Sequence, residues 1–171
     1  MEKLIDKISS YNLFNNLFPG IIFAVISEKY TWFSFRSWNL LFDLFVCYFI
    51  GLVISRFGSL CIEPLLKALK FVKFAEYKEF ITAIKIDPEI KILLEASNMY
   101  RTICSMIILL PVLRLYQWIE QSINYLICLR IFVFILLMIV VFLLSYRKQT
   151  EYIIKRIKAS NNKRLGDNSN D

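Results

Sequence analysis

Charged side chains inside otherwise apolar stretches are the first residues that could do chemistry. Asp43, Arg114 and Arg130 each interrupt a long hydrophobic run. An ionisable residue in a membrane helix is costly and generally faces other protein or water rather than lipid. The three residues therefore predict an intramembrane charge network, whose chemistry would be ion pairing or the attraction of an anion.

The expected depths of these charges decide which of them can pair. In an antiparallel arrangement, Asp43 and Arg114 lie about 8 Å, and Arg130 about 12 Å, below one membrane surface at 1.5 Å per residue. Asp43 can then pair with either arginine, but one carboxylate cannot neutralise two guanidinium groups. Glu120, a lipid phosphate or another anion would have to balance the second. Two interpretations stay open: an interhelical ion pair with Arg114 snorkelling to the interface, or a charged lining of a cavity or of a pore between subunits.

Three asparagines provide a second polar group in an apolar stretch. Asn12, Asn15 and Asn16 lie near the start of the run 8–27, and helical spacing puts Asn12 and Asn15 on one face. Amides at such positions either line a pore or polar interior or hydrogen-bond to neighbouring helices.

The residue types that enzymes most often use are missing from the sequence. There is no His in the chain, which excludes a Ser-His-Asp triad and every His metal ligand. The sequence also has no GxSxG motif, no phosphate-binding P-loop and no paired carboxylates in an apolar run. We therefore predict a protein that is not an enzyme and that uses no cofactor and no metal.

The composition indicates a membrane protein. Hydrophobic residues make up 57% of the 171 residues and charged residues 20%, whereas soluble domains average about 45–50% and about 25%. A net charge of +7 would suggest nucleic acid for a soluble chain. Here the basic residues flank long apolar runs, a pattern that sets membrane orientation, so we expect no direct nucleic-acid binding.

Four apolar runs are long enough to cross a bilayer, whose hydrocarbon core is about 30 Å thick. The predicted spans are 8–27, 38–55, 99–119 and 122–146. The fold class is accordingly all-α, a four-pass transmembrane bundle with a cytoplasmic helical extension between the second and third spans.

The distribution of Lys and Arg predicts the orientation. The first ten residues carry two, residues 55–100 carry seven and the tail from Tyr146 carries seven, which makes 16, against two in the loop 28–37. Because basic loops stay on the cytoplasmic side, both termini are expected in the cytoplasm.

The predicted cytoplasmic parts are the segment 59–98 and the basic tail 147–171, which we expect to be disordered from Ser160 on. Apolar residues recur near a 3.6-residue period from Ser59 to Ile84, which predicts one amphipathic helix. That helix either packs on its own bundle or lies on the inner leaflet. Its lysines are candidates for binding the membrane surface or a partner: Lys67, Lys70, Lys73 and Lys78.

Three stretches carry a resemblance to known proteins. Residues 11–20 (YNLFNNLFPG), 51–59 (GLVISRFGS) and 98–102 (NMYRT) resemble a group of short four-helix bacterial inner-membrane proteins, some of which accompany anti-phage defence genes, as in the Kiwa and Hailong systems. The resemblance implies a bacterial origin and a place in the inner membrane. It also implies a membrane component of an antiviral defence system, either a sensor or a channel-like effector.

The expected partners follow from these assignments. They are the lipid bilayer, further copies of the chain in a homo-oligomer, and a cytosolic protein from the same operon. The alternative is a small transport or membrane-assembly subunit, or an anchor, unrelated to defence.

Overall fold

The computed structural model describes residues 2–31, 33–35 and 39–167, and describes side chains within 13–31, 33–35, 39–123 and 129–160. Helices make up nearly all of this part of the chain, which contains no strand. The elements are α1 (Glu2–Tyr30), α2 (Leu40–Phe57), the π-helical turn η1 (Gly58–Ile62), α3 (Glu63–Ala68), α4 (Tyr77–Ile86), α5 (Glu89–Ser122) and α6 (Asn124–Asp167). The predicted all-α class is confirmed.

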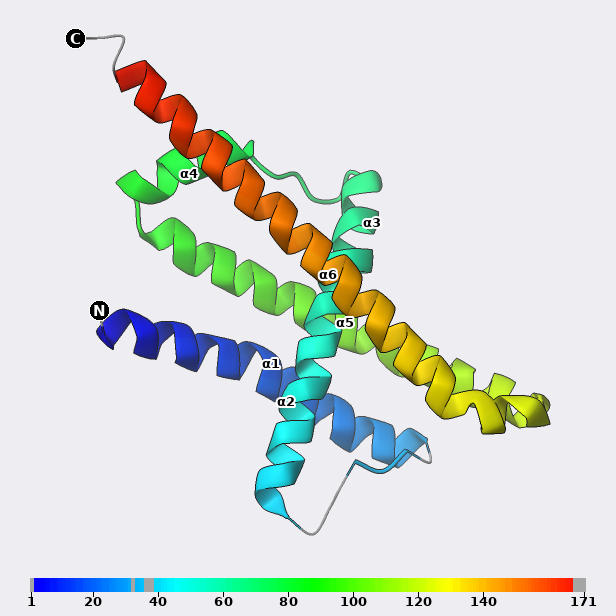
Figure 1. Cartoon of the computed structure of the whole chain (residues 1–171). Coiled ribbons are helices and arrows are strands. Elements are labelled where there is room, and N and C mark those ends of the chain that lie inside the picture. Colours follow the sequence, from blue (N-terminus) through cyan, green and yellow to red (C-terminus); the bar gives the residue numbers. More distant parts are fainter. Residues whose placement is uncertain (1, 32, 36–38, 168–171) are drawn as a thin grey trace.

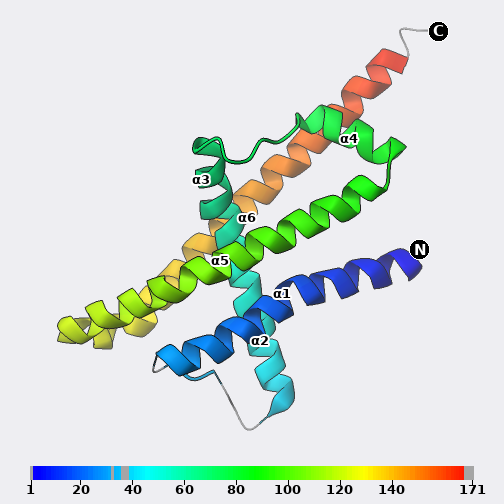
Figure 2. The same cartoon turned by 180° about the vertical axis from the view of Figure 1, so that it is seen from behind.

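Within the described residues, three helices are long and apolar enough to cross a membrane: Leu40–Ala68, Glu89–Ser122 and Leu129–Ser160. The predicted span 8–27 is not among them, so the structure supports three spans where the sequence predicted four. Figures 1 and 2 show α5 and α6 as a long antiparallel pair that α2 crosses, with α1 running in the same direction as α5.

Helices α1 and α2 touch through their backbones. A Cβ atom added to Gly20 would lie 1.8 Å from the Cys47 carbonyl oxygen, and one added to Gly51 would lie 1.7 Å from the Asn16 carbonyl oxygen. Only hydrogen atoms fit there, and membrane helices use such small residues to pack closely. The two glycines therefore fix the point at which α1 crosses α2.

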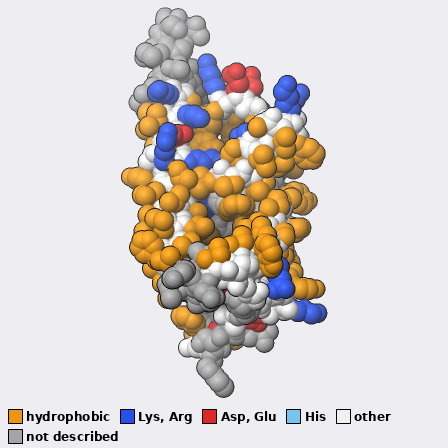
Figure 3. Space-filling view, turned by 90° about the vertical axis from the view of Figure 1, so that its right-hand side faces the viewer, with side chains coloured by type: hydrophobic (Ala, Val, Ile, Leu, Met, Phe, Trp, Pro, Cys, Tyr) orange, Lys and Arg blue, Asp and Glu red, His pale blue; other side chains and the backbone are white. Residues whose placement is uncertain are grey.

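Next to this crossing, a small apolar core joins three helices. Phe23 of α1, Ile54 of α2 and Met106 of α5 are buried together. In contrast, the apolar stretch of α6 from Leu129 onward is almost entirely exposed. Figure 3 shows hydrophobic side chains covering the middle of one face, with most Lys and Arg near the C-terminal end. An exposed apolar band of this kind suits a lipid environment.

The continuous helix from α2 to α3 contains a π-helical turn, for which Pro64 gives the physical reason. A proline inside a helix has no N–H to donate and clashes with the carbonyl four residues earlier. One widened turn, Gly58–Ile62, directly precedes it, and the Glu63 N–H bonds to the Gly58 carbonyl. The wider turn accommodates the proline without breaking the helix.

The predicted continuous amphipathic helix over 59–84 is wrong, because α3 ends at Ala68 and α4 begins only at Tyr77. Lys70 takes a left-handed conformation, with φ 58°. The Phe71 N–H bonds to the Leu66 carbonyl and the Lys70 N–H to the Lys67 carbonyl, which is the Schellman pattern that closes a helix. Helical periodicity cannot reveal this ending, because lysine occupies the position where glycine usually signals it.

The long helix α5 begins at Glu89, directly after an Asp-Pro pair. The Asp87 carboxylate accepts a hydrogen bond from the Glu89 N–H at 2.9 Å, next to Pro88. The helix then continues through Pro111 to Ser122. At the other end of the chain, α6 extends to Asp167, so the described part of the tail is helical where the sequence predicted disorder from Ser160.

Candidate functional site

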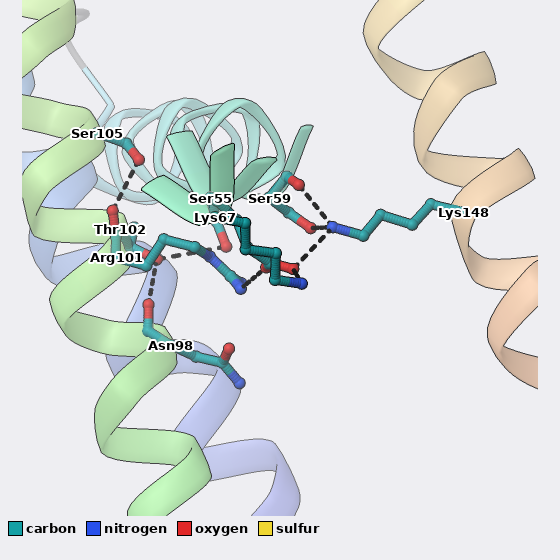
Figure 4. A network of polar contacts seen from close by, with 9 residues as sticks. Ser55, Ser59, Lys67, Asn98, Arg101, Thr102, Ser105 and Lys148 are labelled. Atoms are coloured by element: carbon teal, nitrogen blue, oxygen red, sulfur yellow. Dashed lines mark hydrogen bonds and ion pairs between the residues drawn. The ribbon is translucent and has the colours of Figure 1, made fainter. Parts of the chain in front are cut away.

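A cluster of charged side chains joins three helices at one end of the bundle. Its centre is Glu63, the first residue of α3, which is 7% exposed. Its Oε2 accepts from Arg101 Nη1 of α5 at 2.5 Å, and its Oε1 accepts from Lys67 Nζ at 2.9 Å. Figure 4 shows Arg101 and Lys148 approaching the α2–α3 segment from two different helices. We call Glu63, Lys67, Arg101 and Lys148 the Glu63 cluster.

Lys148 of α6 is held mainly by the widened turn. Its Nζ donates to the Ser59 carbonyl at 2.6 Å and to the Ser59 hydroxyl at 2.8 Å, and lies 3.5 Å from Glu63 Oε1. In the π register the Ser59 carbonyl faces position 64, where proline has no N–H to give. The sequence Gly58–Pro64 therefore leaves a backbone acceptor that a lysine from another helix uses.

Small polar residues bring α5 close enough to place Arg101. Gly58 lies against Ser105, whose hydroxyl would be 2.3 Å from an added Cβ atom. The Thr102 hydroxyl lies 3.4 Å from the Ser55 hydroxyl and donates to the Asn98 carbonyl at 2.9 Å. Thr102 and Ser105 are fully buried. Small and hydroxylic residues are the usual means of close helix packing in membranes.

In each membrane-spanning candidate, the distance along the helix from the cluster residue to the opposite end of the span is about one bilayer thickness. At 1.5 Å per residue, Glu63 is about 35 Å along the helix from Leu40, Arg101 about 32 Å from Ser122, and Lys148 about 29 Å from Leu129. These lengths match a hydrocarbon core of about 30 Å. The cluster therefore lies toward the same end of all three membrane-spanning candidates, the end rich in Lys and Arg.

The cluster carries more positive than negative charge and borders a pocket. One carboxylate faces three cations, a formal balance of +2. The pocket, of about 270 Å³, is lined by Glu63, Pro64, Lys67, Lys148, Glu151, Tyr152 and Lys155. Glu151 is itself paired with Arg147 at 3.2 Å. The positive surplus therefore stays uncompensated by the acids around the pocket.

Each of the predicted intramembrane arginines contacts a polar side chain of α5. Arg130 Nε donates to Glu120 Oε1 at 2.6 Å, and Arg114 Nη1 donates to Gln117 Oε1 at 2.9 Å. Glu120 is 0% exposed, and its Oε2 has no hydrogen-bond partner among the described residues. Glu120 thus supplies the additional carboxylate that the charge count required, and it does so at the turn between α5 and α6.

Asp43 itself lies on the first turn of α2, beside α1. It lines a second pocket, of about 200 Å³, together with Glu28, Phe35 and Cys47 among other residues. Glu28 accepts from the Phe35 N–H at 3.1 Å at the same end of the bundle. The pairing of Asp43 with Arg114 or Arg130 stays a prediction.

Two of the three asparagines predicted to line a pore or polar interior lie inside the bundle. Asn15 and Asn16 are buried, and the Asn15 Oδ1 has no hydrogen-bond partner among the described residues. The backbone of Asn16 touches Gly51 of α2. The side chain of Asn12 lies outside the described residues. The interior part of the prediction fits this burial, while a pore stays a prediction.

The four predicted surface lysines are exposed but differ in their surroundings. Lys67 belongs to the Glu63 cluster and its Nζ lies 4.1 Å from the centre of the Phe74 ring. Lys70 closes α3, Lys73 lies in the connection to α4, and Lys78 is in the first turn of α4. Of these four lysines, Lys67 is therefore held by an ion pair, whereas the other three lie on the open surface.

Sequence reasoning missed Glu63 and Lys148 as partners and gave Arg101 no role. One signal was present: Glu63 and Pro64 fall inside a helical pattern, and a proline there marks a kink or a widened turn. The pairing of helices remote in sequence carries no such signal, because 38 residues separate Glu63 from Arg101 and 85 separate it from Lys148.

Among the described residues, no group of three or more Cys, Asp or Glu side chains could hold a metal ion. No family model, curated protein or solved structure matches the chain.

Proposed function

We propose that the chain is a multi-pass membrane component that senses a disturbance of the bacterial inner membrane and transmits it to a cytosolic partner. The observation that carries the proposal is the Glu63 cluster, which ties the three membrane-spanning candidates together at one end. A movement of one span relative to another has to rearrange these contacts.

Side-chain contacts connect the cluster with helical segments on the proposed cytoplasmic side. Tyr152 lines the cluster's pocket, and its ring lies 6.4 Å from that of Tyr77, the first residue of α4. Helix α4 packs on α5 and α6. The last part of α6 extends past α4 (Figure 1). These exposed helical segments offer a partner a surface coupled to the spans.

The burial of Asn15 and Asn16 favours a sensor over a channel-like effector. Their face of α1 already packs on α2 and α5 through the glycine crossing and the apolar core. A pore axis lined by that face would require these contacts to open. The fourth span, formed by α1, remains part of the proposal, because α1 crosses α2 and runs beside α5. So do cytoplasmic termini and a homo-oligomer.

The antiviral setting rests on the resemblance of residues 11–20, 51–59 and 98–102 to defence-associated membrane proteins. The test is a phage infection assay in a bacterial host that expresses the chain with its neighbouring genes. Lys148→Gln weakens the cluster, and Lys158→Gln is the matched control, since it removes the same charge from the same helix outside the cluster.

We expect the wild type and Lys158→Gln to reduce plaque formation and Lys148→Gln to lose this protection while staying in the membrane. Absence of protection by the wild type with its neighbours would refute the defence role and leave the transport, assembly or anchor alternative. Equal protection by all three chains would refute transmission through the cluster.

A further inference from the structure

The pocket beside the Glu63 cluster combines three features that suit an anionic ligand. It has a volume of about 270 Å³, near the lower end for small-molecule sites. Three lysines line it from two helices: Lys67, Lys148 and Lys155. It lies at the depth at which the apolar spans end.

The charges around the pocket leave it positive. Both acids in the lining have cationic partners of their own: Glu63 is paired with Arg101 and Glu151 with Arg147. Counting these pairs, five cations surround two carboxylates. A multivalent oxyanion gains from such a surplus, because lysine donates charge-assisted hydrogen bonds to phosphate oxygens.

The three lysines differ in how many hydrogen bonds their ammonium groups already make. Lys148 Nζ directs its hydrogen bonds to Ser59 and Glu63. Lys67 makes one hydrogen bond, to Glu63, and its side chain is 43% exposed. Lys155 Nζ lies 5.8 Å from the centre of the Tyr152 ring and is exposed. Lys67 and Lys155 thus offer ammonium groups on two sides of the opening.

We propose that this pocket binds the phosphate group of an anionic phospholipid of the inner leaflet, with Lys67 and Lys155 contacting the phosphate oxygens. The acyl chains then lie against the exposed apolar side chains of α6. The inference deepens the proposed function, on whose membrane placement it rests, by naming the ligand of the sensing cluster. A phosphate group could also come from a soluble compound, so the test separates the two sources.

Native mass spectrometry of the protein in a neutral detergent counts bound lipids without the surface potential of an anionic bilayer. The wild type is titrated with phosphatidylglycerol and with zwitterionic phosphatidylcholine. Lys67→Gln/Lys155→Gln removes two charges from the pocket, and Lys73→Gln/Lys78→Gln removes two exposed charges outside it. Because an exposed ion pair contributes up to about 1 kcal/mol, we expect the pocket variant to bind phosphatidylglycerol up to about 30-fold more weakly, and the other variant to change less than about threefold.

Equal losses in the two double variants, or equal binding of the two lipids by the wild type, would overturn the proposal. Displacement of phosphatidylglycerol by inorganic phosphate alone would assign the pocket to a soluble phosphate compound and also overturn it. If the pocket variant does not fold, Lys155→Gln is compared with Arg156→Gln, which removes the neighbouring charge on the same helix. Absence of phage protection by the wild type, together with lipid binding as expected, would refute only the proposed function.

Discussion

The two ionic contacts at opposite ends of the spanning helices are built differently. At one end, Glu63 meets cations from α3, α5 and α6, and residues far apart in the sequence come together. At the other, Glu120 meets Arg130 across the turn between α5 and α6, only ten residues away. The first contact ties three helices into one unit, whereas the second closes a hairpin that the chain connectivity already brings together.

The Glu63 cluster and the Glu120–Arg130 pair also differ in burial and in charge balance. Glu63 has more cations than it can neutralise, and the excess faces a pocket. Glu120 has one cationic partner, and Arg130 is 38% exposed. A surplus of positive charge beside a pocket can attract a ligand, while a one-to-one ion pair mainly neutralises a charge. The Glu63 cluster is therefore the stronger candidate for function.

The largest effect should follow the loss of the Glu63 charge. Glu63→Gln leaves three cations close together without a carboxylate, and breaking a buried ion pair by removing one partner costs about 3–5 kcal/mol. We expect a loss near 3 kcal/mol in the free energy of unfolding, measured by denaturation in detergent. Glu151→Gln removes an exposed acid of α6 and should cost less than about 1 kcal/mol. Equal losses would show that the cluster does not hold the spans together.

A smaller effect compares the Glu120–Arg130 pair with the Asp43–Arg130 pair that the sequence predicted. Because Arg130 donates to Glu120 at 2.6 Å, a double-mutant cycle of Glu120→Gln and Arg130→Gln should show a coupling of about 1 kcal/mol. The cycle of Asp43→Asn and Arg130→Gln should show less than about 0.5 kcal/mol. The reverse order would restore Asp43 as the carboxylate that neutralises Arg130.

Apolar run lengths predicted the helical class and three candidate spans. These features depend on local pattern. The Glu63 cluster was out of reach because it depends on which helices become neighbours and on a π-helical turn that rotates the following residues. The sequence shows Gly20 and Gly51, but not that they meet.

The smallest effect concerns the end of α3, which the periodicity of residues 59–84 concealed. Lys70 has a φ of 58°, where glycine is favoured over residues with a Cβ atom. Lys70→Gly should therefore raise thermal stability in detergent slightly, by up to about 1 kcal/mol, whereas Lys73→Gly in the same connection should not. A loss of stability in Lys70→Gly would argue against the left-handed helix end.

The central claim is that the Glu63 cluster lies at the cytoplasmic boundary of spans that cross the inner membrane. Alkaline phosphatase is active only outside the cytoplasm, so fusions to it report the side of each connection. We predict an active enzyme when the fusion follows Thr31, between α1 and α2, and an inactive one when it follows Lys85 in α4, the helix whose first residue, Tyr77, contacts Tyr152 of the cluster's pocket. An active fusion after Lys85 would contradict the claim, because it would place the cluster and its basic helices on the outer face.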